Sequence, residues 1–531
     1  MIKENAVTLC HGAERISRCS AACFDCRCCP CDFDCCYSAG FDFCFGCYCG
    51  SDRSRKSPLF HDYCSPTAAN LYIKRENTMA LPIEFLNKMR LMLENRFVEY
   101  ENALSEPPFR AMRINTIKAD KELLKKHFQF VDTPTEFCDE SYYLPPDTKR
   151  LGNHPLHHAG AFYLQEPSAS SVVEAIGIEE GDFVLDLCAS PGGKSTQAAA
   201  KLNNTGLLVS NEFVASRVKP LTSNIERMGI VNAIVYSQRP DRIAESFCDF
   251  FDKVIVDAPC SGEGMFRKES AAVENWSEEN VRSCAERQLK ILESAAQCVK
   301  PGGKIVYSTC TYSFEENEGV IARFLKNRTD FKLVKPIKNF GEPAFARYAP
   351  DTENIEYARR IFNFNGGEGH FAAVLIREGE TEPNGVVLCP DLFDPMDKEL
   401  KLFGEFYKEN FEGEVPLNTV NKNGFVYITP FEASKNEPRP VQSGVLAGVC
   451  KNNRFIPEHS LYNNTVFVPK RHIDLAVGDE RLYKFLHGEE ISCDGDLKGY
   501  TQVRCEGIPL GFGKASSGVL KNHYPKGIRT L

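Results

Sequence analysis

Phe183-Val-Leu-Asp-Leu-Cys-Ala-Ser-Pro-Gly-Gly-Lys194 joins an apolar run of strand length to a glycine-rich turn, and a helical segment follows at 195–202. Gly192 and Gly193 let the backbone approach a ligand closely, and the first turn of the helix presents free N–H groups. The strand itself ends in the carboxylate of Asp186. A strand, a glycine-rich turn and a helix in this order predict a ligand-binding unit of an α/β fold.

The carboxylate suits a cationic ligand better than a phosphate. The methionyl part of S-adenosylmethionine carries an ammonium and a sulfonium, so this cofactor is the candidate. A phosphate loop is the alternative, because Gly193-Lys194-Ser195 is similar to the end of a Walker A motif. That motif requires glycine at position 188, where Cys188 stands, and Pro191 departs from it further. A tight turn that binds nothing is the third possibility.

Around this turn, from residue 161 to about 378, apolar runs of strand length alternate with helical segments. Strands are expected at 183–187, 206–210, 233–236, 253–257, 304–308 and 370–376, and helices at 195–202, 214–228 and 286–299. This alternation predicts a doubly wound parallel sheet, whose ligands bind at the carboxyl ends of the strands.

Two further residues at strand ends are candidates for the cofactor site. Glu212 ends the second strand, and a carboxylate ~20 residues after a glycine-rich turn can take the two hydroxyls of a ribose. Gln238 follows the third strand, where an adenine contact is expected.

Two cysteines also follow strands of this sheet. Asp257-Ala-Pro-Cys260 and Ser308-Thr-Cys310 place a thiol just past two strand ends, among Pro, Gly, Ser and Thr. A buried core cysteine is the alternative for either one. A thiolate that adds to carbon 6 of cytosine makes carbon 5 nucleophilic enough to accept a methyl group. Lys194 would supply part of the positive charge that lowers the thiol pKa, and a protonated Asp257 would act as the acid at N3.

The remaining composition sets the domain plan. The chain has 531 residues and a formal net charge of −9, and 13 of its 24 cysteines precede Met79. Cys26-x-x-Cys29 and Cys44-x-x-Cys47 are compatible with a zinc ribbon, but the surrounding cysteines single out no ligand set. We therefore expect no bound metal. We also expect residues 1–78 to be either a disordered extension or sequence that lies upstream of a true start at Met79.

Four further segments follow the extension. We predict a small α+β RNA-binding module at 79–160, the methyltransferase sheet at 161–378, a linker and small segment at 379–440, and a β barrel at 441–531. No apolar run approaches the ~20 residues that span a bilayer, and no secretory signal is recognisable. We expect a cytoplasmic protein that does not bind membranes.

These motifs together resemble the Sun/nucleolar-protein family of RNA cytosine-5 methyltransferases, and within it the bacterial 16S ribosomal RNA methyltransferase F type. The resemblance extends over residues 79–378. It rests on Arg113-Ile-Asn-Thr116, Phe162–Ser168, Cys188–Lys194, Asn211-Glu212, Asp257–Gly264 and Ser308–Tyr312.

The resemblance implies a Rossmann-like class I methyltransferase fold with S-adenosylmethionine as cofactor. It implies that Cys310 is the nucleophile and that Cys260 assists product release, two roles that spacing alone does not assign. It also implies cofactor contacts from Glu212, from Asp257 and from the loop of Cys188, Ala189, Ser190, Pro191, Gly192, Gly193 and Lys194.

RNA is the expected partner, and we expect the chain to act as a monomer. Phe266, Arg267 and Lys268 would stack on bases and contact phosphates, and the basic stretch 511–529 resembles the PUA-like end domain of the same family. The alternatives are a transfer RNA substrate, DNA, or a non-catalytic ribosome-assembly factor that retains the fold.

Overall fold

The computed structural model describes residues 81–380, 388–432 and 438–530. The predicted cysteine-rich extension, residues 1–78, lies outside the described residues. Within the described ranges, none of the helices is both long enough and apolar enough to cross a bilayer.

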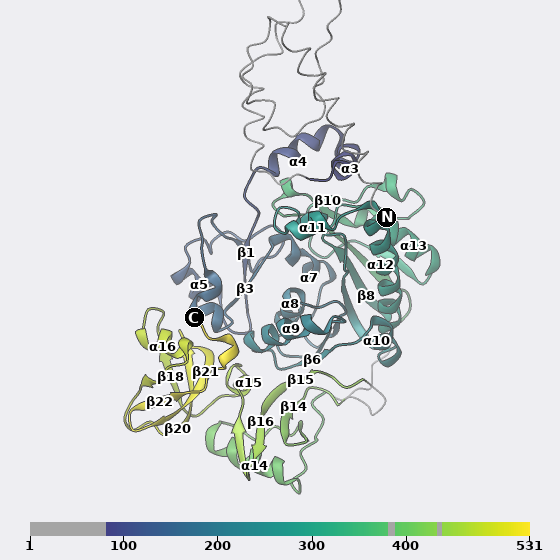
Figure 1. Cartoon of the computed structure of the whole chain (residues 1–531). Coiled ribbons are helices and arrows are strands. Elements are labelled where there is room, and N and C mark those ends of the chain that lie inside the picture. Colours follow the sequence, from purple (N-terminus) through teal and green to yellow (C-terminus); the bar gives the residue numbers. More distant parts are fainter. Residues whose placement is uncertain (1–80, 381–387, 433–437, 531) are drawn as a thin grey trace, which may run out of the picture. The chain divides into compact units, whose positions relative to one another are not determined.

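A ten-stranded sheet forms the centre of the described chain (Figure 1). Five of its strands run parallel in the order β6-β5-β4-β7-β8, so the chain starts in the middle and winds outward in both directions. This is the predicted Rossmann-like class I methyltransferase arrangement, and it is confirmed. The strands are β4 (Phe183–Asp186), β5 (Leu207–Asn211), β6 (Ala233–Tyr236), β7 (Phe251–Asp257) and β8 (Val299–Thr309).

The sequence predicted a parallel sheet, whereas the whole sheet is mixed. β12 (His370–Arg377) lies antiparallel to β8 and to β9 (Phe331–Val334). The five parallel strands are joined by crossover helices, whereas β12 follows its antiparallel neighbour β11 (Arg359–Ile361) through the loop at 362–369 and therefore runs in reverse. Its first residue consequently lies at the edge where β7 and β8 end. The edges are completed by β10 (Glu342–Pro343), β11 and β15 (Gln442–Ser443).

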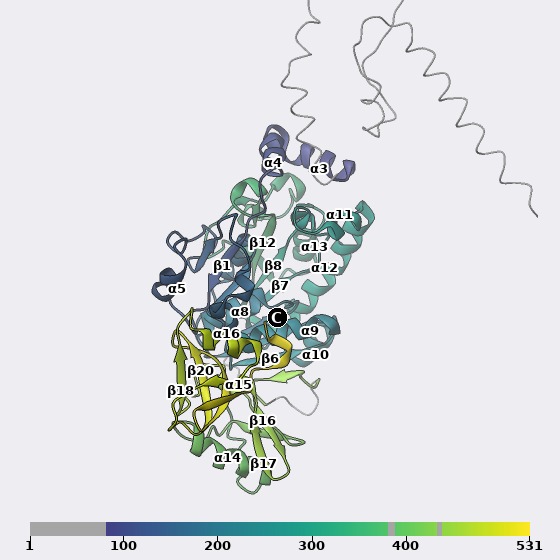
Figure 2. The ribbon, with the colours of Figure 1, turned by 60° about the vertical axis from the view of Figure 1, so that its left-hand side comes forward.

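Helices cover both faces of the sheet. Alternate residues of each strand point to opposite faces, so a continuous apolar strand such as β7 contributes to two cores. One core packs α10, α12 and α13 on the sheet, and the other packs α7, α8 and α9. Their bounds are α7 Ser171–Ile176, α8 Gly193–Leu202, α9 Ala215–Arg227, α10 Pro240–Ser246, α12 Glu278–Cys298 and α13 Glu318–Asn327. Figure 2 shows α12 and α13 beside β7 and β8.

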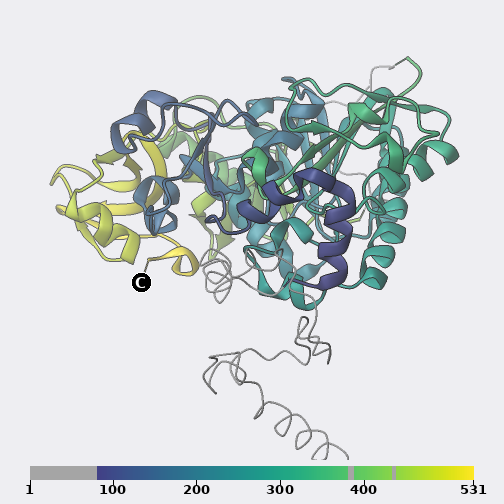
Figure 3. The ribbon, with the colours of Figure 1, turned by 90° about the horizontal axis from the view of Figure 1, so that it is seen from above.

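The segment predicted as an N-terminal module at 79–160 is divided between two cores. Its helices α3 (Ile83–Leu93) and α4 (Phe97–Ala103), purple in Figure 3, pack in one cluster with Phe266, Trp276 and Tyr312 near the sheet. Its remaining elements share a different core with the C-terminal sheet. These elements are β1 (Ala111–Ile114), α5 (Lys121–His127), β2 (Ser141–Tyr143), α6 (Pro155–His158) and β3 (Phe162–Gln165).

Two small sheets form the C-terminal part (Figure 1). A four-stranded sheet packs on α14 (Lys398–Asn410), and because its strands lie on both sides of residue 440, the predicted boundary there falls inside one sheet. It consists of β13 (Thr419–Lys422), β14 (Phe425–Ile428), β16 (Val445–Lys451) and β17 (Arg454–Pro457). The five-stranded sheet consists of β18 (His472–Leu475), β20 (Gly499–Cys505), β21 (Ile508–Ser516), β22 (Val519–Asn522) and β19 (Ile491–Ser492), with α16 (Glu480–His487) on its core.

One buried lysine joins three of these parts. Lys118 is 9% exposed, and its ammonium donates to the carbonyl oxygens of Ala159, Arg227 and Pro509 and to Oδ1 of Asn463, at 2.9 to 3.2 Å. Burial and the charge of Arg227 lower the pKa of Lys118 well below its usual range, and the four oxygens accept the hydrogen bonds of the buried amino group. The lysine therefore links the loop after β1 to α9, to β21 and to Asn463, which follows α15 (His459–Tyr462).

We expect Lys118→Met to lower the free energy of unfolding by about 3 kcal/mol, because four buried oxygens lose their donor. Urea unfolding of the full chain measures this change. Lys126→Met on the exposed face of α5 is the control, with an expected change under about 0.5 kcal/mol. Equal effects of the two substitutions would contradict the role given to Lys118.

Candidate functional site

The two predicted cysteines lie side by side at the carboxyl edge of the sheet. Cys260 follows the end of β7 by three residues and Cys310 directly follows β8, and their sulfur atoms are 3.2 Å apart. Both cysteines line one cavity of about 1270 Å³. The predicted residues Cys188, Ser190, Glu212 and Asp257 line the same cavity. Spacing along the chain could not show this juxtaposition, because it depends on β7 and β8 being neighbours.

The two thiols share their hydrogen-bonding environment. The pKa of Cys260 lies well above its ordinary value, first because of its hydrogen bond with Cys310, then because of burial and the nearby charge of Cys310 and Glu316. Two thiolates 3.2 Å apart would repel each other. Cys260 therefore keeps its proton and can donate it to a thiolate at Cys310.

Lys194 and Asp257 form a buried ion pair in the same region. Lys194 Nζ lies 2.8 Å from Asp257 Oδ2, and the hydroxyl of Ser308 donates to Oδ1 at 2.9 Å. Burial acts to raise the pKa of Asp257, but the charge of Lys194 and the hydrogen bonds from Lys194 and Ser308 outweigh it and hold this pKa below its usual value. Asp257 is thus a carboxylate in this structure, whereas the sequence suggested a protonated acid. The transferable proton of the pair resides on Lys194.

Two buried glutamates hold the cysteine loops together. Glu316 accepts hydrogen bonds from the backbone and the hydroxyl of Ser261 and from Gln288, and Glu263 accepts from Trp276 and from the backbone of Tyr312. Burial raises the pKa of Glu316 to about 7. Sequence reasoning assigned these glutamates no role. Only the position of Glu263 inside the Pro-Cys motif could have drawn attention to it.

Gly264 is the point of closest approach between these loops. Its N–H donates to the carbonyl of Cys310 at 2.9 Å, and an added Cβ would lie 2.6 Å from the carbonyl oxygen of Gly369 and 3.0 Å from that of Cys310. Both obstacles are backbone atoms, so neither can swing away. The glycine is therefore required for the cysteine loop to pack against the end of β8.

The glycine-rich loop is fixed from several sides. Gly192 has φ +107°, which a residue with a side chain rarely adopts, and α8 begins directly after it. Arg113, 2% exposed, donates to the carbonyl of Gly193 at 2.8 Å. Ser190 and Arg217 exchange two hydrogen bonds of 2.8 Å. The Arg113 contact ties the loop to β1, which the sequence motif around Arg113 did not indicate.

The residues of this site fit S-adenosylmethionine. Asp186 is fully buried, its Oδ2 accepts from Ser195 at 2.7 Å, and its Oδ1 has no hydrogen-bond partner among the described residues. Burial and the charge of Asp257 raise the pKa of Asp186 to about 7, a penalty that a nearby cation would relieve. Glu212 is 4% exposed at the cavity wall, with Oε1 fixed by the N–H of Val214 at 2.7 Å. A carboxylate there can accept from ribose hydroxyls.

The predicted adenine contact, Gln238, is held by its backbone. Its N–H and carbonyl both pair with the side chain of Asn211 at 3.0 Å. The cavity wall on this loop consists instead of the next three residues, Arg239, Pro240 and Asp241. Gln238 is not among the residues that line the cavity, and its contact with the adenine stays a prediction. Arg239 and Asp241 are the polar side chains of this wall, and they form an ion pair at 2.7 Å.

Two of the three predicted RNA contacts after the Pro-Cys loop have structural roles. Phe266 is 2% exposed and packs on Phe85 with ring centroids 4.9 Å apart. Arg267 forms a paired ion bridge with Glu368, both bonds 2.8 Å long, and donates to the carbonyl of Ala103 at 2.6 Å. These contacts use up the groups that base stacking or phosphate binding would need.

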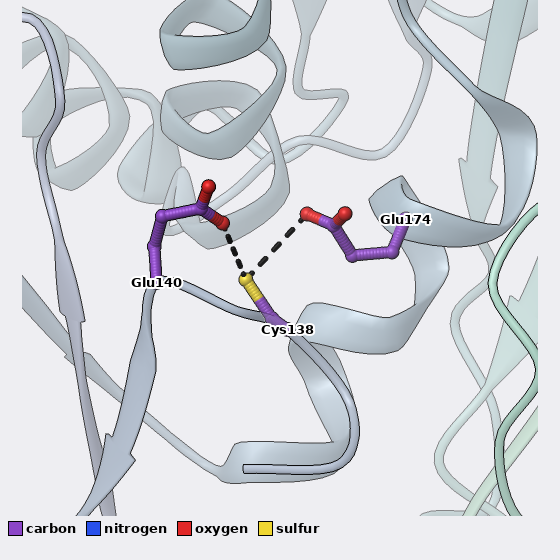
Figure 4. Close-up of side chains that lie close together, drawn as sticks. All are labelled: Cys138, Glu140 and Glu174. Atoms are coloured by element: carbon purple, nitrogen blue, oxygen red, sulfur yellow. Dashed lines mark hydrogen bonds between the residues drawn. The ribbon is translucent and has the colours of Figure 1, made fainter. Parts of the chain in front are cut away.

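A cysteine and two glutamates also meet outside the cavity (Figure 4). Cys138 Sγ lies 3.2 Å from Glu140 Oε2 and 3.5 Å from Glu174 Oε1. Lys201 already supplies a cation, with Nζ 3.3 Å and 3.0 Å from the same two carboxylates. Burial raises the pKa of Cys138 far above its usual value, so the thiol keeps its proton and donates. The cluster is a hydrogen-bonded ion pair, and the expectation of no metal stays a prediction.

Three family models match successive parts of the chain. The N-terminal domain of 16S rRNA methyltransferase RsmF matches residues 81–167. The 16S rRNA methyltransferase RsmB/F model matches residues 173–376, which contain the cavity and both cysteines. The methyltransferase RsmF PUA domain matches residues 473–530, the five-stranded sheet.

Individual proteins match over most of the chain. The ribosomal RNA small subunit methyltransferase F of Vibrio vulnificus is 30% identical and covers 84% of this chain and 97% of its own length. The corresponding protein of Aliivibrio fischeri is 35% identical with the same coverage.

Two solved structures share the fold. A crystal structure of PH0851 matches 56% of this chain and 66% of its own, with 26% identity and a TM-score of 0.52. NSun6 from Pyrococcus horikoshii, solved with SFG, an S-adenosylmethionine analogue, covers 56% of this chain and 99% of its own, with 19% identity and a TM-score of 0.50. With the geometry above, these matches show that the chain belongs to the RsmF family of S-adenosylmethionine-dependent methyltransferases.

Proposed function

We propose that this protein methylates carbon 5 of a cytosine in 16S ribosomal RNA through a covalent bond between Cys310 and carbon 6. The observation that carries the proposal is the pair of sulfur atoms 3.2 Å apart beside the Lys194–Asp257 ion pair, in one cavity with the cofactor loop. The Vibrio vulnificus and Aliivibrio fischeri relatives are named as ribosomal RNA small subunit methyltransferases, which favours the same substrate here.

Cys310 is the proposed nucleophile. Its thiolate adds to carbon 6, and carbon 5 then becomes electron-rich enough to accept a methyl group. When bound, S-adenosylmethionine supplies that methyl group in electrophilic form. Afterwards a solvent water accepts the proton from carbon 5, the electrons of that C–H bond form the double bond between carbons 5 and 6, and the bond between sulfur and carbon 6 breaks so that Cys310 leaves as a thiolate. Cys260, which keeps its own proton beside Cys310, assists this release.

Lys194 and Asp257 are proposed to hold the cytosine. The Asp257 carboxylate can accept a hydrogen bond from the exocyclic amino group of cytosine. Uracil lacks this amino group. The Lys194 ammonium stands beside it and can donate to N3 as negative charge develops there. The base must leave its stack to reach this cavity, so these two groups also replace the hydrogen bonds that it loses.

The five-stranded sheet is proposed to bind the RNA backbone. Lys514 on β21 and Lys521 on β22 are directly opposite cross-strand partners and both are exposed. Like charges in that position repel, so their pairing favours an anionic ligand. We further propose that the protein acts as a monomer in the cytoplasm.

Bisulfite sequencing of total RNA from cells with and without the gene tests the substrate. We expect one 5-methylcytosine in small-subunit ribosomal RNA to disappear on deletion and to return with the wild-type gene. A Cys310→Ala gene is the matched control and should not restore it. Unchanged ribosomal RNA together with a lost transfer RNA mark would reject the assignment in favour of a transfer RNA substrate.

A further inference from the structure

A buried histidine beside the Lys194–Asp257 pair has no part in the scheme above. His370 is the first residue of β12, and because β12 is antiparallel to β8, it lies at the edge where Cys310 follows β8. The residue is 7% exposed. Its pKa responds to the charges of both Lys194 and Asp257, so the imidazole lies within electrostatic reach of the pair.

The hydrogen bonds behind His370 fix its tautomer. The hydroxyl of Ser168 donates to Glu166, and the same oxygen lies 3.1 Å from His370 Nδ1. Because the hydroxyl proton points to Glu166, Nδ1 must be the donor to the hydroxyl oxygen. Glu166 is itself held by the backbone N–H groups of Ser168 at 3.0 Å, Ala169 at 2.8 Å and Glu368 at 2.9 Å. The hydrogen bonds from His370 Nδ1 to Ser168 and from Ser168 to Glu166 therefore both donate toward Glu166, and the fixed carboxylate holds the imidazole in place.

This arrangement leaves a lone pair on Nε2. Burial lowers the pKa of His370, and the charges of Lys194 and Lys268 act in the same direction against those of Glu166 and Asp257, so the ring is neutral. Nε2 is buried and has no hydrogen-bond partner among the described residues. Buried acceptors without a donor are costly and rare, which indicates that a donor reaches this atom in another state of the protein.

We propose that His370 is a positioning residue whose Nε2 accepts a hydrogen bond from Lys194 when the cytosine is hydrogen-bonded to Asp257. The ammonium has three hydrogens, and in this structure Asp257 Oδ2 accepts one of them at 2.8 Å. Once the carboxylate turns toward the amino group of the base, Lys194 loses part of its counter-charge. A neutral acceptor fixed by Ser168 and Glu166 then keeps the ammonium charged and directed at N3. This inference rests on the proposed function of the same site.

Methylation of an RNA substrate by purified full-length protein tests the proposal, with kcat, KM and their pH dependence measured for His370→Leu and His370→Gln. For His370→Leu we expect kcat about tenfold lower with KM for RNA little changed, because the lost acceptor acts after binding. The alkaline limb of the profile should move to lower pH, since Lys194 loses its proton more readily without the acceptor. In His370→Gln the amide oxygen can occupy a position close to that of the lost Nε2 atom and accept the same hydrogen bond, so this variant should retain more of kcat than His370→Leu.

Ser168→Ala tests the same row of hydrogen bonds independently of His370. It leaves the imidazole in place but removes the group that fixes its tautomer, so we expect a smaller loss in the same direction. Combined with His370→Leu it should add no further loss, because the two residues act as one unit. Thermal unfolding of each variant, together with its affinity for S-adenosylmethionine, verifies that the fold and cofactor site are intact.

Three results would overturn the inference. The first is an unchanged pH profile in His370→Leu, and the second is an equal kcat for His370→Leu and His370→Gln. The third is the same shift of the alkaline limb in Lys268→Met, which would identify Lys268 and not Lys194 as the donor to Nε2. If wild-type protein makes no 5-methylcytosine in RNA, the proposed function itself fails, and this outcome is distinguishable because it is read from the wild type alone.

Discussion

A Cys310→Ala protein should methylate RNA at least about 10⁴-fold more slowly than wild type in single-turnover measurements. Without the thiolate, carbon 5 of cytosine has no route to a nucleophilic form, and no other described side chain at the end of β8 can replace it. Binding of S-adenosylmethionine should be unchanged, because β8 is separated from β4 and its glycine-rich loop by β7, and the sulfur of Cys310 is hydrogen-bonded to that of Cys260.

Cys248→Ala is the matched control for this substitution. Cys248 is an exposed free cysteine outside the cavity, and we expect its replacement to leave the rate unchanged. An undiminished rate in Cys310→Ala, or in Cys310→Ser, would show that the covalent bond is unnecessary.

Cys260→Ala should instead retain the covalent RNA complex. The sulfur of Cys260 stands 3.2 Å from that of Cys310 and keeps its proton, so it is the group next to the bond that must break. We expect kcat to fall about 100-fold, typical of the loss of a proton-transfer group, while attack still occurs. Denaturing electrophoresis with labelled RNA should show a slowly migrating protein–RNA band that wild type does not accumulate.

The double substitution Cys260→Ala with Cys310→Ala is the control for this band and should abolish it. If Cys260→Ala loses activity without any retained complex, the part of Cys260 in release is contradicted. A retained complex in the double variant would place the covalent bond on a different residue.

The class of the central sheet could be predicted from the sequence because its signals are local. The run before Asp186, the two glycines and the helix after them each follow from neighbouring residues, and β4, Gly192 and α8 lie where they were expected. Cys260 and Cys310 could be nominated for the same reason, since each closely follows a strand. Their assignment to different roles came from the resemblance to a family and not from spacing.

The remaining features depend on contacts between distant segments. The direction of β12 follows from its antiparallel pairing with β11 and β8, which no local pattern encodes, and His370 reaches the site only because of that direction. Phe266 and Arg267 resembled an RNA-binding pair in sequence, but α3 and Glu368 occupy them. The division of the N-terminal module follows in the same way, because its strands bury apolar side chains against the C-terminal sheet.

The central claim is that the sulfur of Cys310 bonds to carbon 6 of the cytosine. RNA that carries 5-fluorocytosine tests it most directly with wild-type protein, because fluorine replaces the proton that must leave carbon 5. Elimination then cannot occur, and the covalent complex is retained. Trypsin separates the two candidates, since Cys260 falls in the peptide 254–267 and Cys310 in the peptide 305–323. Mass spectrometry should find the methylated fluorocytidine on peptide 305–323. A nucleotide on peptide 254–267, or on neither peptide, would contradict the account.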